Sequence, residues 1–172
     1  MDKRRHLATD TGIYGYDVFE VLLNYEIARV KRYPSPLTLM HLTLASEGVS
    51  ESFRMQAHEA MTSLLNRTLR VSDVPAHYQD EFLILLPSTD DSGAKAVAER
   101  ILSSYRTTQS LSTGRLSTKR NAYLGLTCQN GGSVLSAQQL RAEAAAAMSE
   151  ARLRQSYTYI AFRELTDKSV GT

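Results

Sequence analysis

The chain has 172 residues, which is enough for one domain with a buried core. Hydrophobic residues make up 42% and charged residues 22%, as is typical of globular proteins, and a net charge of +2 does not favour nucleic acid or a membrane surface as a partner. No apolar run is long enough to span a bilayer. Cys128 is the only cysteine, so an internal disulfide is excluded, and we expect a cytoplasmic protein or the cytosolic part of a larger sensor.

The first half of the chain predicts two helices, a buried strand and a hairpin. Apolar residues recur at helical spacing over about 15–33 and again over about 50–70. Between them, residues 37–44 form an apolar run of strand length, which we expect to be covered on both faces. Two short apolar runs separated by a polar turn predict a hairpin with strands at 74–77 and 82–86.

The second half predicts two further helices and two further strands. A helix is expected to begin at Asp90, with a buried apolar stripe that reaches Tyr105. The Ser- and Thr-rich segment 107–120 predicts a loop with a small ribbon, and residues 122–127 predict a strand. A capping box at Ser136 predicts the last helix, and 157–162 predicts a closing strand. No linker divides residues 1–172, and this order indicates one α/β domain, an α+β sandwich with helices covering one sheet.

The polar turn carries the most informative motif. It reads Tyr78-Gln79-Asp80-Glu81-Phe82, is followed by an apolar strand, and resembles the hairpin of the GGDEF family, the diguanylate cyclases. Other segments resemble that family in the same order, namely Thr11–Tyr14, Leu37–Ala45, Arg70–Asp73, Ala98–Ile101, Leu124–Leu126 and Ala146–Met148. The resemblance covers about residues 8–162. It implies a mixed sheet of about five strands surrounded by helices, related to nucleotidyl cyclases, whose active members join two GTP molecules into cyclic di-GMP as dimers.

The same resemblance implies that the cyclase chemistry is lost. The positions that match the metal-binding aspartates of the family are Thr43 and Ala45, so Asp80 and Glu81 have no acidic partners across the site. Tyr78 and Gln79 stand where the family has two glycines, and side chains there take the space of a substrate phosphate. The loop after residue 45 is also about five residues shorter than usual, which removes the guanine-reading residues. We therefore expect no catalytic residue, no metal and no cofactor.

Arg70 and Asp73 match the RxxD motif of the family's product-binding site, and Arg100 falls where the family often has a second arginine. An arginine fork complements the O6 and N7 acceptors of guanine, and a carboxylate complements its N1 and N2 donors. The resemblance therefore implies a regulatory receptor for cyclic di-GMP, with either a second copy or a signalling domain as its partner. We expect Arg70→Ala or Asp73→Ala to abolish binding.

Simpler interpretations of the same residues remain open. Arginine is common at helix ends, aspartate is common in turns, and Arg100 and the acidic pair of the hairpin are equally compatible with ordinary solvated positions. The alternative function is a protein–protein interaction or dimerisation module without nucleotide binding, and an active cyclase is the least favoured. His41 lies within an apolar strand and is expected to be a hydrogen-bonded core histidine.

Overall fold

The computed structural model describes residues 12–45, 48–113, 121–132, 136–155 and 158–167, with the backbone alone for 109–113. Its helices are α1 (Tyr16–Arg32), α2 (Glu51–Thr68), α3 (Asp91–Thr113), α4 (Ala137–Leu153) and α5 (Phe162–Asp167). Its strands are β1 (Leu37–Leu44), β2 (Val74–Tyr78), β3 (Glu81–Pro87), β4 (Ala122–Gln129) and β5 (Ile160–Ala161). None of the described helices combines the length and the apolar character needed to cross a membrane.

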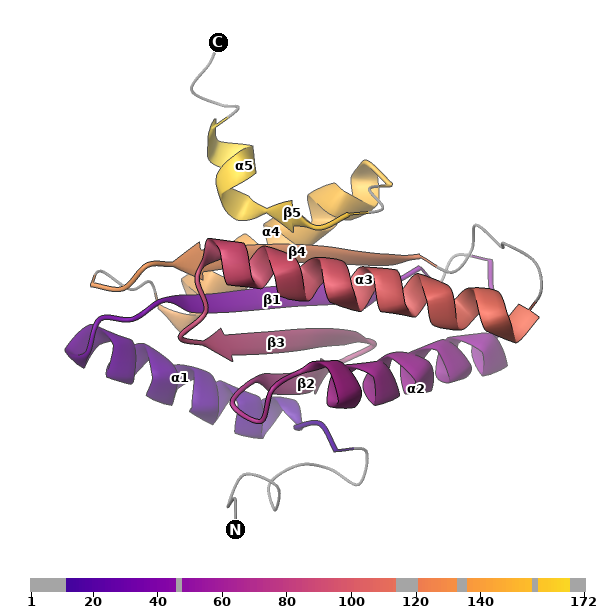
Figure 1. Ribbon diagram of the computed structural model, residues 1–172, viewed down its shortest axis with the longest axis horizontal. Coiled ribbons are helices and arrows are strands. Elements are labelled where there is room, and N and C mark those ends of the chain that lie inside the picture. Colours follow the sequence, from indigo (N-terminus) through magenta and orange to yellow (C-terminus); the bar gives the residue numbers. More distant parts are fainter. Residues whose placement is uncertain (1–11, 46–47, 114–120, 133–135, 156–157, 168–172) are drawn as a thin grey trace.

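The strands form one mixed sheet in the order β2-β3-β1-β4-β5 (Figure 1). β1 pairs antiparallel with both β3 and β4, β2 pairs antiparallel with β3, and β5 pairs parallel with β4. Helices α2 and α3 cover one face of the sheet, and α1 and α4 cover the other. The predicted α+β sandwich with a five-stranded sheet is therefore confirmed.

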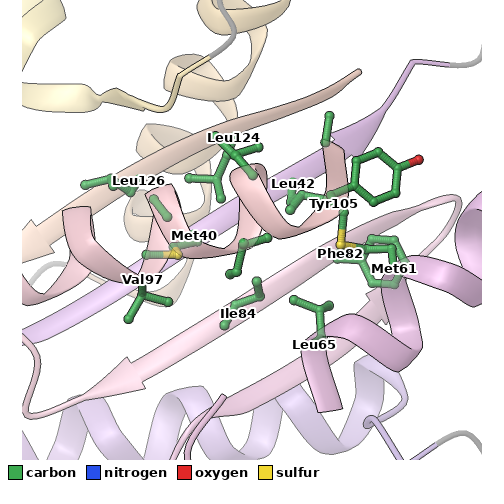
Figure 2. Packing of buried hydrophobic residues seen from close by; sticks show 14 of the residues in the cluster. Met40, Leu42, Met61, Leu65, Phe82, Ile84, Val97, Tyr105, Leu124 and Leu126 are labelled. Carbon is green, nitrogen blue, oxygen red and sulfur yellow. The ribbon is translucent and has the colours of Figure 1, made fainter. Parts of the chain in front are cut away.

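Burial on both faces explains why β1 is almost continuously apolar. Met40 and Leu42 point to the α2/α3 side, where they pack with Phe82, Ile84 and Tyr105 in the larger core cluster (Figure 2). Leu37 and Leu39 alternate to the α1/α4 side and join a second cluster. The sheet thus separates two cores, and the strand at its centre contributes to each.

Helix α4 lies unusually close to β4 because small residues face each other across the contact. A Cβ placed on Gly125 would lie 2.0 Å from the Met148 backbone nitrogen and 2.5 Å from the Ala144 oxygen. Ala144 and Ala147 are both fully buried at this contact. The alanine-rich sequence of α4 therefore serves packing within the domain.

Two predictions for the C-terminal half of the chain are wrong. Residues 107–113 continue helix α3 instead of forming a loop, and the hydroxyls of Thr107 and Thr108 bond to the carbonyls of Ser103 and Ser104 within the helix. The predicted ribbon near Gly114 lies outside the described residues. In place of a strand over 157–162, β5 has two residues and Phe162 begins the unpredicted helix α5. Partial burial of Phe162 and Leu165 against a small cluster supports this helix, and so short a periodicity does not reveal it.

Candidate functional site

The Arg70–Asp73 segment lies at the end of the sheet where β1 and β2 begin and β3 ends. Register places Val74 opposite Leu85 and Leu37 opposite Pro87, so the loops next to these residues converge. Helix α3 starts at the same edge. These segments enclose a pocket of about 240 Å³ lined by Pro36, Arg70, Asp73, Ser88, Thr89, Asp90, Gly93 and Val97. The structure thus brings two of the three predicted ligand-binding residues to one hollow.

Asp73 is buried at the base of a tight turn. Its Oδ2 accepts a hydrogen bond from the Arg70 backbone nitrogen at 2.8 Å, and its own backbone nitrogen donates to the Arg70 oxygen at 3.0 Å. Burial raises the pKa of the Asp73 carboxyl, against the opposing effects of the Arg70 hydrogen bond and charge, the Ser72 hydroxyl and the Arg100 charge. The protein therefore holds a carboxylate in a place that disfavours its charge, which is a common property of ligand-binding groups.

The guanidinium of Arg70 is exposed on the pocket wall, and no ion pair with Asp73 forms within the described residues. Arg100 lies elsewhere. Its Nη2 donates to the Thr68 carbonyl at 3.1 Å, at the C-terminal end of α2, and Arg100 is not among the residues that line the pocket. The positive charge of Arg100 therefore lies at the C-terminal end of helix α2, where it interacts favourably with the helix dipole.

A third arginine, which the sequence did not indicate, reaches the rim of the pocket. Arg29 of α1 extends Nη2 to 3.5 Å from the Ser88 hydroxyl, and Glu26 holds its Nε at 2.8 Å. Ser88 lines the pocket and has a left-handed backbone (φ 51°). Because Arg29 and Ser88 are 59 residues apart in sequence, no motif spacing connects them.

The hairpin motif lies at the opposite end of the sheet. The Tyr78 ring packs 5.0 Å from the Tyr16 ring and 5.8 Å from the His41 ring, so it occupies space between α1 and the sheet. Gln79 has φ 55°, a conformation that glycine adopts without strain and glutamine does not. Asp80 is exposed and Phe82 is fully buried.

Glu81, the second acidic residue of the motif, is already paired within the protein. The His41 Nε2 lies 2.5 Å from the Glu81 Oε2, and His41 is 5% exposed, which confirms the expected core histidine. The hydrogen bond from His41 is the largest influence that lowers the pKa of Glu81, assisted by the His41 charge, Thr43 and Arg152, while burial opposes the shift. The Glu81 carboxylate is thus already engaged by a side chain of the protein itself.

The side chains around Glu81 do not fit a magnesium ion, the metal that the resemblance would imply here. Magnesium requires several oxygen ligands in near-octahedral geometry, and the buried neighbours of Glu81 supply one hydroxyl and an imidazole. Within the part of the chain that the structure describes, no three Asp, Glu, His or Cys side chains are grouped to hold a metal ion.

The other face of the hairpin carries a stack of two histidines on a phenylalanine. His58 of α2 lies 5.0 Å from His77 and 4.4 Å from Phe82, measured between ring centroids. Burial lowers the pKa of His58, partly offset by Asp80, and burial followed by the His58 charge lowers the pKa of His77. Both shifts favour the neutral form of each ring.

This stack predicts that acid destabilises the fold before carboxylates titrate. Because the folded-state pKa of each histidine lies below 6.5, the ordinary value of a histidine, the unfolded chain binds more protons than the folded protein as the pH falls below 6.5. The free energy of unfolding should therefore be highest at pH values above 6.5 and should decrease as the pH falls below 6.5. Thermal melts of the wild type and of His58→Phe/His77→Phe check this, and an equal slope in both proteins would contradict it.

The described residues form an α/β domain with a mixed five-stranded sheet, in which the two-residue turn Gln79-Asp80 joins β2 and β3. The sequence profile described as the GGDEF domain of diguanylate cyclases matches residues 56–157, which is more than half of the chain. The chain therefore belongs to the GGDEF family. No curated protein gives a significant match.

Solved structures show the same fold at low sequence identity. The GGDEF domain of DgcB from Caulobacter crescentus, in complex with c-di-GMP, has a TM-score of 0.76 at 16% identity, covering 94% of this chain and 96% of that one. The diguanylate cyclase SiaD of Pseudomonas aeruginosa, in complex with its activator SiaC, gives 0.71 at 23%, covering 90% and 60%. The FimX GGDEF domain of the same organism gives 0.69 at 17%, covering 88% and 95%.

Proposed function

We propose that this chain is a catalytically inactive GGDEF domain that binds cyclic di-GMP as a regulatory receptor. The observation that carries the proposal is the pocket of about 240 Å³ in which Arg70 and Asp73 are neighbours on the wall. Family membership and the c-di-GMP complex of DgcB supply the ligand class. In this proposal, residues of the Arg70–Asp73 turn and of helix α3 recognise the ligand.

Each group of the pocket has a defined task in this proposal. The Asp73 carboxylate keeps acceptor capacity beyond the Arg70 and Ser72 bonds, and it accepts from the guanine N1 and N2 donors. The Arg70 guanidinium, which is exposed, donates to O6 and N7 or to phosphate. A hollow of this size is smaller than the ~300–1,000 Å³ typical of ligand pockets, so it takes one guanine ring while the other half of the ligand lies outside.

The arginines outside the turn differ in their expected contributions. Arg29 is close enough to Ser88 to contact a phosphate at the rim of the pocket. Arg100 influences Asp73 through its charge and is held by the Thr68 carbonyl. We therefore assign a ligand contact to Arg29 and a smaller, electrostatic role to Arg100.

We propose that catalysis is lost because side chains of the protein itself occupy the hairpin site. Thr43 stands where the resemblance places an aspartate, His41 pairs with Glu81 at 2.5 Å, and Tyr78 fills space beside them. These side chains do not provide the arrangement that two reacting phosphates and a metal ion would need. The output is instead a ligand-dependent change in pairing with a second copy or a signalling domain in the cytoplasm.

Titration calorimetry and a turnover assay test this proposal together. We expect cyclic di-GMP to bind the wild-type chain, Arg70→Ala to lose binding and Arg100→Ala to retain most of it. No cyclic di-GMP should form from GTP and Mg²⁺. Absence of binding heat at high micromolar ligand would refute the receptor function, and product formation would refute the inactivity.

A further inference from the structure

Helix α1 presents a continuous exposed stripe on the side opposite its buried residues. Phe19, Leu23, Ile27 and Val30 face the core, whereas a second set at spacings of four, four, three and four residues faces outward. We call this set the α1 outer stripe: Asp17, Val21, Tyr25, Ala28 and Arg32. Val21 is 69% exposed and Tyr25 is 65% exposed, which is unusual for two large apolar side chains on one helix face.

The charges of the stripe are arranged with opposite signs at its two ends. Asp17 lies in the first turn of α1, and Arg32 lies in the last. Asp17 and Arg32 are equally distant in sequence from the point between Asn24 and Tyr25, and so are Val21 and Ala28. The stripe therefore complements itself when a second copy is rotated by a two-fold axis through that point.

We propose that two copies of this chain associate through antiparallel α1 helices. In that arrangement Asp17 of each copy meets Arg32 of the other, Val21 meets Ala28, and the two Tyr25 side chains pack beside the axis. A parallel pair would place Asp17 against Asp17 and Arg32 against Arg32, so the charge pattern selects the antiparallel orientation. The antiparallel helix dipoles favour the same choice.

The size of this surface predicts a weak dimer. A 17-residue helix is about 25 Å long, and a single helix pair of that length belongs to the smallest class of specific interfaces. Association is therefore expected at micromolar to millimolar protein. This inference concerns a face distinct from the Arg70–Asp73 pocket and is independent of nucleotide binding, because no pocket-lining residue belongs to the stripe.

Sedimentation of the full chain without nucleotide, over a concentration series, tests the proposal. Wild type should shift from monomer to dimer, and D17R or R32D should each weaken association about tenfold or more because two contacts become repulsive. The double variant D17R/R32D restores both opposite-charge contacts and should dimerise again. An equimolar mixture of D17R and R32D should form a heterodimer.

Several results would overturn the proposal. These are a wild type that stays monomeric at the highest concentration, single variants that associate like the wild type, and failure of both the mixture and the double variant to dimerise. Circular dichroism melts of each variant confirm that the fold is intact, as expected for substitutions at two exposed positions.

Discussion

Asp73→Asn is expected to weaken cyclic di-GMP binding by about 30-fold or more without unfolding the protein. The substitution exchanges a carboxylate for an amide whose NH₂ group faces the guanine donors, so two donors lose their acceptor. Breaking one side of a buried charged hydrogen bond costs about 2–5 kcal/mol, and the lower limit corresponds to that loss of affinity. Calorimetric titration at neutral pH measures the effect.

The fold should tolerate this change because the amide keeps the structural bond. An asparagine oxygen accepts from the Arg70 backbone nitrogen as the Asp73 Oδ2 does at 2.8 Å. Since burial raises the pKa of the Asp73 carboxyl, its charged form opposes folding at neutral pH, and a neutral amide removes that cost. The melting temperature at pH 7 should be unchanged or higher, which separates a binding defect from a folding defect.

Asp80→Asn provides a matched control for the same chemical exchange. Asp80 is an exposed residue of the hairpin motif and does not line the pocket. Its substitution should leave affinity unchanged. Binding that survives in Asp73→Asn and fails in Asp80→Asn would place the ligand at the hairpin end of the sheet and contradict the receptor site proposed above.

Gly125→Ala is expected to give the largest loss of stability. The added Cβ would lie 2.0 Å from the Met148 nitrogen and 2.6 Å from the Ala147 carbonyl carbon, and these are backbone atoms that cannot rotate away. Helix α4 must lift from β4, an overpacking that costs about 3 kcal/mol. For a domain of this size the melting temperature should fall by about 6–12 °C, measurable by calorimetry or circular dichroism.

Gly15→Ala is the control for this prediction. Gly15 caps α1 with φ −72°, and a Cβ there would have no atom within 4 Å. Replacing a capping glycine with alanine costs about 0.5–1 kcal/mol, so its effect should be much smaller than that of Gly125→Ala. Equal melting temperatures for the two variants would mean that α4 packs less closely on β4 than the structure shows.

Local sequence patterns predicted most elements because each pattern depends on neighbouring residues. The buried stripe of α1, the apolar run of β1 and the capping box at Ser136 all correspond to elements within about two residues of the prediction. The exceptions are the C-terminal part of α3 and the β5–α5 segment. Serine and threonine disfavour helices in isolation, but back-bonding hydroxyls accommodate them, and a two-residue strand has no detectable periodicity.

In the candidate site, too, some features could be predicted from sequence and others could not. Arg70 and Asp73 are three residues apart, so the resemblance to the RxxD motif could pair them before the structure was known, and the structure places both at one pocket. Arg29 and Ser88, by contrast, meet only because α1 packs near the turn after β3. Spacing along the chain contains no information about such a contact.

Sequence patterns predicted the helices and strands from α1 to β5, the resemblance to the GGDEF family and the replacement of the hairpin glycines by Tyr78 and Gln79, but not helix α5. Tertiary structure decided what those replacements do: the Tyr78 ring packs against Tyr16 and His41, and His41 pairs with Glu81 from a strand 40 residues away. The physical reason is that backbone preference and hydrophobic periodicity act between neighbours, whereas burial, charge pairing and pocket shape depend on strand register.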